Sequence, residues 1–116
     1  FAQGGNLIFL SSISGLAGNV GQANYATAKS GLVGLAADLG SRGPVRCNAV
    51  APGFIETRMT AAIPFMIREG ARRMAALKQG GLPDDVGALV TFLASPSSAA
   101  VNGQTIRVCG GNMIGA

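Results

Sequence analysis

Three short apolar runs divide the chain into strand-like and helix-like segments. Residues 5–11, 45–51 and 105–109 are predicted strands, and the first of them is a nearly continuous apolar run up to Leu10, which is typical of a buried parallel strand. Between them, apolar residues recur with a helical period and predict helices near 22–41 and 84–94. The pattern predicts an α/β fold of three layers, with parallel strands covered by helices on both faces and residues 105–109 at a sheet edge.

Small polar residues gather where the first predicted strand ends. Ser11, Ser12 and Ser14 follow the apolar run, and a loop rich in glycine and asparagine, residues 18–22, leads into the first helix. In open α/β sheets, ligands bind just outside the carboxyl ends of the strands. We therefore expect a ligand site at this end of the sheet.

The first predicted helix carries a tyrosine and a lysine at a spacing suited to proton transfer. Tyr25, the only tyrosine among 116 residues, stands four positions before Lys29, one of two lysines. Residues i and i+4 share a helix face, and a nearby cation lowers the pKa of a phenol from its usual value of about 10. Such a tyrosine can give a proton to a carbonyl oxygen near neutral pH. The alternative is an aromatic residue and a lysine that share the face of an ordinary helix.

Several ordered motifs together resemble one family. They are Ser12, Tyr25 and Lys29 at their spacings, and the segments 18–25 (GNVGQANY), 48–57 (NAVAPGFIET) and 103–111 (GQTIRVCGG). This set resembles the short-chain dehydrogenases/reductases, and most of all their 3-oxoacyl-[acyl-carrier-protein] reductases of fatty-acid biosynthesis. Residues 107–116 are similar to the high-molecular-weight, actinobacterial branch of that group.

The resemblance implies a fold and a place within it. Residues 1–116 would form the C-terminal, catalytic and substrate-binding part of a single dinucleotide-binding reductase domain with a Rossmann-like, doubly wound parallel sheet. The Gly-rich turn for the diphosphate and the family's catalytic asparagine would then belong upstream of Phe1. On this interpretation we expect the 116-residue chain alone to be inactive.

The same resemblance assigns three catalytic roles. Tyr25 would be the proton donor in ketone reduction, and Lys29 would lower the pKa of that tyrosine and bind the nicotinamide ribose. Ser12 would donate a hydrogen bond to the substrate oxygen, where negative charge grows. Ser12 could instead cap local backbone, and Ser11 and Ser14 are rivals for its role.

A second strand-to-loop transition resembles the family's nicotinamide-binding segment. The strand at 45–51 stops at Pro52 and Gly53, and in the family the backbone at Ile55 reaches the carboxamide while Thr57 lies near the diphosphate. With Tyr25 and Lys29, these residues would bind NADP or NAD, which supplies the hydride. The alternative is a plain Pro-Gly turn after a strand.

The stretch from Met59 to Leu77 resembles the family's mobile substrate-binding region. Its three arginines, Arg68, Arg72 and Arg73, suit an acidic carrier protein or a phosphopantetheine group, or belong to an ordinary exposed helix face. The expected substrate is an acyl thioester on acyl carrier protein or CoA. The alternatives are a hydroxysteroid, sugar or acetoacetyl-CoA dehydrogenase, or a truncated, non-catalytic relative that acts only as an interaction fragment.

Composition narrows the remaining possibilities. The absence of Trp and His and the few aromatic residues argue against nucleic-acid recognition by stacking, and a net charge of +4 does not by itself imply such a partner. Without a His for a metal site, we expect no metal. No apolar run approaches the ~20 residues of a membrane span, so we expect no membrane partner and a cytoplasmic protein. Cys47 and Cys109 are expected to be reduced and buried on neighbouring strands.

One departure from the family concerns the first helix. Between Lys29 and Asn48 the chain is about three residues shorter than is usual for the family, which is nearly one helical turn. The length of this helix, and the subunit contact that it usually builds, is therefore an open question. When full length, the protein is expected to be a homo-oligomer, either a dimer or a tetramer.

Overall fold

The computed structural model describes residues 5–12, 23–56, 61–62, 64–73 and 75–111, with the side chains of the first helix described from residue 27 onwards. In chain order, its elements are β1 (Asn6–Leu10), α2 (Ala23–Arg42), β2 (Arg46–Pro52), α4 (Phe65–Arg73), α5 (Pro83–Ala94), a single 3₁₀ turn (Pro96–Ser98) and β3 (Thr105–Val108). The three strands and the two long helices lie where the apolar pattern predicts them.

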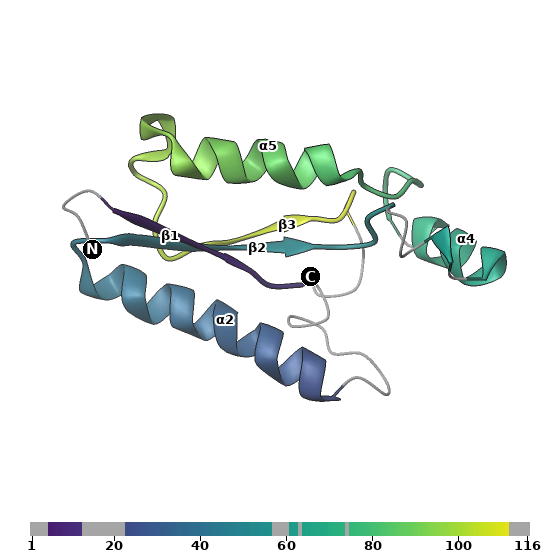
Figure 1. Ribbon diagram of the computed structural model, residues 1–116, viewed down its shortest axis with the longest axis horizontal. Coiled ribbons are helices and arrows are strands. Elements are labelled where there is room, and N and C mark those ends of the chain that lie inside the picture. Colours follow the sequence, from purple (N-terminus) through teal and green to yellow (C-terminus); the bar gives the residue numbers. More distant parts are fainter. Residues whose placement is uncertain (1–4, 13–22, 57–60, 63, 74, 112–116) are drawn as a thin grey trace.

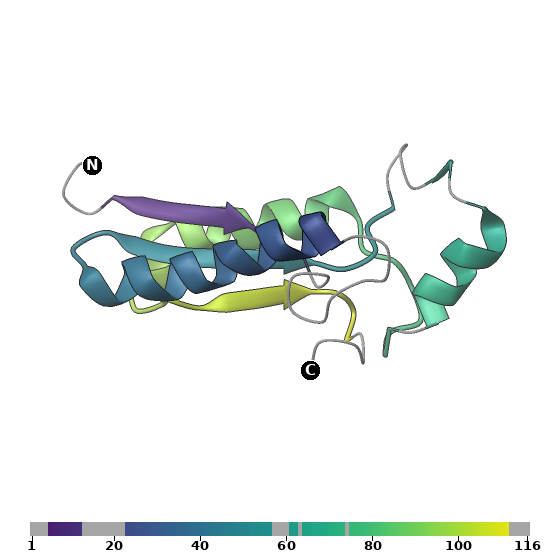
Figure 2. The same cartoon turned by 90° about the horizontal axis from the view of Figure 1, so that it is seen from below.

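The strands form a parallel sheet between two helices. Their order is β1-β2-β3, with Leu10 beside Val50 and Val50 beside Ile106. Helix α2 covers one face and α5 the other, while α4 lies beyond the carboxyl ends of the strands (Figures 1 and 2). The prediction of a three-layer α/β fold is confirmed, and β3 lies at an edge of this sheet as expected.

The central strand β2 is buried because it has a neighbour on every side. Residues from Cys47 to Ala51 are all buried, as expected for a strand that is covered on both faces. On the α2 face, Ala36, Cys47 and Ala49 form the core, and Leu7, Phe9 and Leu39 pack around them. Small residues here bring α2 close to the sheet.

Polar side chains fasten the amino end of β2 to the turn before β3. Asn48 is fully buried; its amide nitrogen donates to the Val101 carbonyl at 2.9 Å, and its oxygen accepts from the Gln104 N–H at 3.0 Å. Arg46 donates to the Ser98 carbonyl at 2.6 Å and reaches the Leu93 carbonyl, near the end of α5, at 3.5 Å. A cation at this end of a helix is favourable because of the helix dipole. The end of the sheet opposite the expected site is therefore held together by these hydrogen bonds.

The length of α2 answers the question raised by the short segment before Asn48. The helix has 20 residues and reaches Arg42, so that only residues 43–45 connect it to β2. Gly43 supports this tight connection with a φ of +49°, a conformation that favours glycine. No helix in the described part of the chain is long and apolar enough to cross a membrane.

The expectation for the cysteines is half right. Neither cysteine is in a disulfide, and Cys47 is buried in β2 as predicted. Cys109 is only half-buried and follows β3, which ends at Val108. The strand stops there because the chain turns away through Gly110 and Gly111, at φ values of +62° and +77°.

Gly40 provides a test of the packing between α2 and the turn before β3. A Cβ atom at Gly40 would lie 2.7 Å from the Asn102 side-chain oxygen and 2.8 Å from the Gly103 backbone. At Gly34, on the same helix, a Cβ atom would meet nothing within 4 Å. We expect Gly40→Ala to lower the free energy of unfolding by about 1–2 kcal/mol, because overpacking outweighs the gain in helix propensity.

The matched substitution is expected to act in the opposite direction. Gly34→Ala should stabilise the chain by up to about 1 kcal/mol through helix propensity alone. Urea unfolding of both variants, followed by circular dichroism, compares the two. Equal responses at the two glycines would show that the close approach at Gly40 does not matter.

Candidate active site

The carboxyl ends of the three parallel strands lie along one edge of the sheet. Leu10 leads into Ser11 and Ser12, Pro52 leads into Gly53, and β3 ends at Val108. Gly53 donates its N–H to the Val108 carbonyl at 2.8 Å, which ties the second of these ends to the third. The N-terminal half of α2 lies at the same end of the sheet (Figure 1).

Lys29 connects helix α2 to the end of β1. Its ammonium Nζ donates to the Leu10 carbonyl at 3.0 Å. The Lys29 carbonyl accepts a hydrogen bond from the Ser11 hydroxyl at 2.6 Å, and the Ser11 N–H donates to the Val50 carbonyl at 2.7 Å. The lysine is therefore held at the carboxyl edge from both its side chain and its backbone.

Among the candidate serines, the structure gives Ser11 a structural role. Ser11 is only 4% exposed, and its hydroxyl is committed to the Lys29 carbonyl. Ser12, one residue further along, is half-buried at the same edge, and Ser14 is outside the described residues. The sequence alone gave no sign of the bond between Ser11 and Lys29, because it joins residues 18 positions apart.

Tyr25 lies in α2, one helical turn before Lys29. This backbone position confirms the predicted helical spacing, and four residues correspond to about 6 Å along the helix axis. The side chain of Tyr25 is outside the described part of the chain. The convergence of its hydroxyl with Ser12 and Lys29 stays a prediction.

The segment after β2 runs beside a pair of glycines. Ile55 forms a parallel bridge with Gly81, in which Gly81 donates to the Phe54 carbonyl at 2.9 Å and Glu56 donates to the Gly81 carbonyl at 2.8 Å. Backbone groups alternate in direction along an extended chain, so those of Ile55 itself point away from Gly81. Thr57 is outside the described residues.

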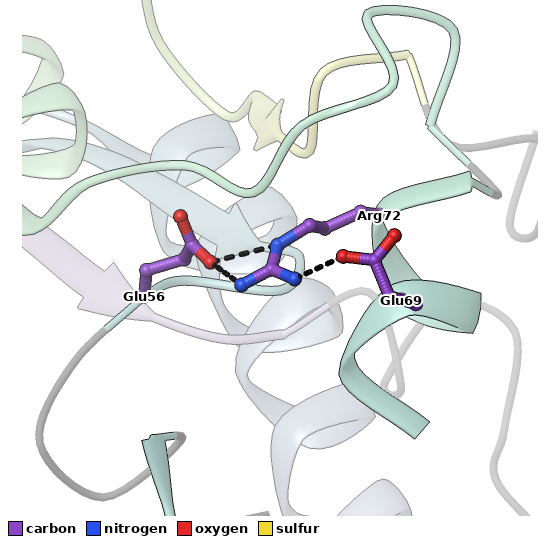
Figure 3. A network of polar contacts seen from close by, with 3 residues as sticks. All are labelled: Glu56, Glu69 and Arg72. Atoms are coloured by element: carbon purple, nitrogen blue, oxygen red, sulfur yellow. Dashed lines mark hydrogen bonds and ion pairs between the residues drawn. The ribbon is translucent and has the colours of Figure 1, made fainter. Parts of the chain in front are cut away.

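A charged cluster that the sequence did not predict joins α4 to this segment. Arg72 of α4 pairs with Glu56 through two of its nitrogens and with Glu69 through a third (Figure 3). The hydrogen bonds that Arg72 donates to Glu56 and then to Glu69 raise the pKa of its guanidinium above the ordinary value. Of the three arginines expected to face a partner, Arg72 is thus engaged within the chain, Arg68 lies over the Phe65 ring and Arg73 is exposed.

A cavity of about 420 Å³ lies beside the carboxyl end of β3. Its lining comes from three parts of the chain, which are the segment after α4, helix α5 and the end of β3: Leu77, Gln79, Gly80, Gly81, Asp85, Leu89 and residues 106–110. No local sequence pattern marks it, because the lining residues are far apart along the chain.

Cys47 allows a test of how closely the sheet is covered. Burial raises the pKa of the Cys47 thiol above its ordinary value. The folded thiol therefore keeps its proton to a higher pH than the unfolded one. The contribution of this thiol to the free energy of unfolding is complete below its unfolded pKa of about 8.5. That contribution is lost as the pH rises from the unfolded pKa toward the folded pKa.

We therefore expect the free energy of unfolding to fall more between neutral and alkaline pH in the native chain than in Cys47→Ala. Urea unfolding at pH 7 and at about pH 9.5 measures the difference. A thiol reagent should also modify Cys109 well before Cys47. Equal labelling rates would contradict the burial of Cys47.

Comparisons with known proteins agree with this geometry. The family described as enoyl-(acyl carrier protein) reductase matches residues 1–112. The chain is 44% identical over 111 residues to the (3R)-3-hydroxyacyl-CoA dehydrogenase of Mus musculus, an alignment that covers 92% of this chain and 42% of that protein. It is 43% identical over 116 residues to the 3-oxoacyl-[acyl-carrier-protein] reductase of Thermotoga maritima, covering 97% of this chain and 47% of the relative.

Structural similarity points the same way. A crystal structure of 3-oxoacyl-[acyl-carrier protein] reductase from Brucella melitensis superimposes with a TM-score of 0.90 at 31% identity, covering 95% of this chain and 42% of that one. The chain belongs to the short-chain dehydrogenase/reductase family of oxidoreductases. It spans less than half of the length of the relatives that it matches.

Proposed function

We propose that this chain is the catalytic and substrate-binding part of a reductase that converts a 3-oxoacyl thioester to the 3-hydroxyacyl form with NADPH or NADH. The observation that carries the proposal is the position of Lys29. Its ammonium is held 3.0 Å from the carbonyl of Leu10, two residues before Ser12, and Lys29 lies one helical turn after Tyr25 in α2. A cation, a phenol and a hydroxyl at one edge are the groups that carbonyl reduction requires.

The chain's own residues suit the nicotinamide end of a dinucleotide. The proposed binding residues are Tyr25, Lys29, Pro52, Gly53, Ile55 and Thr57. The backbone groups of Ile55 point away from Gly81. A bound nicotinamide cofactor, NADP or NAD, would supply the hydride.

In the proposed reaction, each side chain has one task. Ser12 donates to the substrate's carbonyl oxygen, which gains negative charge as the ketone is reduced, and Tyr25 delivers the proton to that oxygen. Lys29 supports the phenol electrostatically and binds the cofactor ribose. The buried Ser11 keeps Lys29 in place through its carbonyl.

The proposed substrate class follows from the relatives. Proteins named for 3-hydroxyacyl-CoA and for 3-oxoacyl-[acyl-carrier-protein] are both over 40% identical to this chain. We propose that the whole protein uses acyl thioesters on acyl carrier protein or CoA, and works in the cytoplasm as a dimer or tetramer. Residues 1–116 would then be one part of a single dinucleotide-binding domain.

A substrate panel tests this proposal in an active context. A chimera that joins the upstream half of the Thermotoga maritima reductase to this chain is assayed with acetoacetyl-CoA, an acetoacetyl carrier-protein thioester, a ketosteroid and a keto sugar. We expect kcat/KM to be at least about tenfold higher for the thioesters. A preference for the steroid or the sugar would reject the thioester assignment.

A non-catalytic interaction fragment predicts a different outcome. Such a fragment would give a folded chimera that turns over none of the four substrates. The unmodified Thermotoga maritima reductase, assayed in parallel, shows that the conditions support turnover. Failure of the chimera alone would therefore count against the catalytic proposal.

A further inference from the structure

Helix α4 has little apolar contact to hold it in place. None of its residues is buried, and Phe65, Met66 and Ile67 are 61%, 78% and 63% exposed. It lies apart from the sheet, beyond the carboxyl ends of the strands (Figure 2). An isolated helix of nine residues is marginal in water, so its position must come from specific polar contacts.

Arg72 makes such contacts in three directions. Its Nε lies 2.8 Å from Glu56 Oε1, which Nη2 also contacts, and its Nη1 lies 2.5 Å from Glu69 Oε1. The guanidinium carbon is 5.9 Å from the centre of the Phe54 ring. Figure 3 shows the guanidinium between a glutamate of its own helix and a glutamate of the segment after β2.

The Glu56 end of this contact is rigidly placed. The Glu56 N–H is bonded to the Gly81 carbonyl. A Cβ atom at Gly80 would lie 2.7 Å from Glu56 Cγ and 2.8 Å from the Phe54 ring. Glycine is therefore required where this backbone passes Glu56 and Phe54, and Arg72 is fastened to a fixed point.

We propose that Arg72 is a positioning residue that holds α4 at the carboxyl edge of the sheet and fixes the backbone of residues 54–56. Both ends of its guanidinium are occupied by carboxylates of the chain, so it acts inside the molecule and does not receive an acidic partner. Because Ile55 lies within the fixed segment, α4 and the proposed nicotinamide contact are coupled. That last consequence rests on the proposed function, whereas the anchoring of α4 does not.

Amide hydrogen exchange on the 116-residue chain at low micromolar concentration tests the anchoring directly. We expect Arg72→Met to raise exchange in residues 65–73 by about tenfold, because the helix loses charge-assisted hydrogen bonds. Arg73→Met is the matched control, since Arg73 is exposed on the same helix, and it should change exchange less than twofold. Exchange in β2, residues 46–52, should not change in either variant.

Two conservative variants resolve the remaining outcomes. Glu56→Gln should also raise exchange in α4, and Arg72→Lys should raise it partly, because an ammonium cannot form the same fork to two carboxylates. If Arg72→Met also raises amide exchange in β2, Arg72→Lys takes its place in the comparison with Arg73→Met. The proposal is overturned if amide exchange in α4 is the same in Arg72→Met as in Arg73→Met. It is also overturned if neither Arg72→Lys nor Glu56→Gln changes the exchange in α4.

The consequence for the site is measured separately in the chimera. There, Arg72→Met should raise the KM for NADPH at least threefold while Arg73→Met leaves it unchanged. A chimera without turnover would reject the proposed function and leave the exchange result standing. A normal KM together with accelerated exchange would reject the coupling to the cofactor and keep the anchoring of α4.

Discussion

Replacing Tyr25 with phenylalanine in the chimera is expected to lower kcat for an acetoacetyl thioester by at least about 100-fold. The ring keeps its size and its place one turn before Lys29, and only the proton-donating hydroxyl is lost. The reduced oxygen would then have to take its proton from water. Steady-state assays with NADPH measure the loss.

The fold provides the control for this result. Phenylalanine leaves the helix pattern of α2 unchanged, so circular dichroism and the unfolding midpoint should match those of the parent chimera. A folded Tyr25→Phe variant with near-normal turnover would show that another group donates the proton.

The second large effect is expected at Lys29. Lys29→Met removes the ammonium that reaches the Leu10 carbonyl at the carboxyl edge, and with it the proposed cation for Tyr25 and the proposed donor to the cofactor ribose. We expect kcat/KM to fall by at least about 100-fold, because both a charge and a positioning contact are lost. The methionine side chain keeps most of the apolar stem of lysine.

Ser11→Ala separates chemistry from anchoring at this position. It removes the hydrogen bond to the Lys29 carbonyl and leaves the ammonium in place. We expect a stability loss of about 1 kcal/mol and a fall in kcat/KM of less than tenfold. Equal losses in Lys29→Met and Ser11→Ala would indicate that Lys29 has only a structural role.

Local pattern was sufficient to predict the sheet and its two covering helices. The apolar run from Leu7 to Leu10 predicted β1, the stop at Pro52 and Gly53 marked the end of β2, and α2 keeps its helical period over 20 residues. Pro83 opens α5 and Asp85 accepts the Leu82 N–H at 2.7 Å, both of which are local features of a helix start. These signals act within a few residues of each other.

The features that the sequence did not predict all depend on tertiary contacts. Ser11 was a rival of Ser12 for the substrate-binding role, but its hydroxyl donates to the Lys29 carbonyl. Arg72 looked like a cation for an external partner, but Glu56, 16 residues earlier, is brought beside it. Arg46 and Asn48 gave no local sign of the cross-links that they make to residues 93–104. Such pairings follow from the fold and leave no periodic signal.

The central proposal is that this chain supplies one part of a cofactor site whose other part comes from an upstream half. Tight dinucleotide binding draws on a Gly-rich turn and a helix N-terminus for the diphosphate. The proposed binding residues of this chain would contact mainly the nicotinamide end. The chain alone should therefore bind NAD(P)H weakly, whereas a chain joined to an upstream half should bind it tightly.

Calorimetric titration with NADPH and NADH, with acetoacetyl thioester turnover measured on the same samples, tests this claim most directly. For the chimera, we predict micromolar binding of at least one cofactor and measurable turnover. For the 116-residue chain alone, we predict no saturable binding of either cofactor up to about 1 mM and no turnover. Micromolar binding with turnover by the isolated chain, or a folded chimera with neither, would contradict the account.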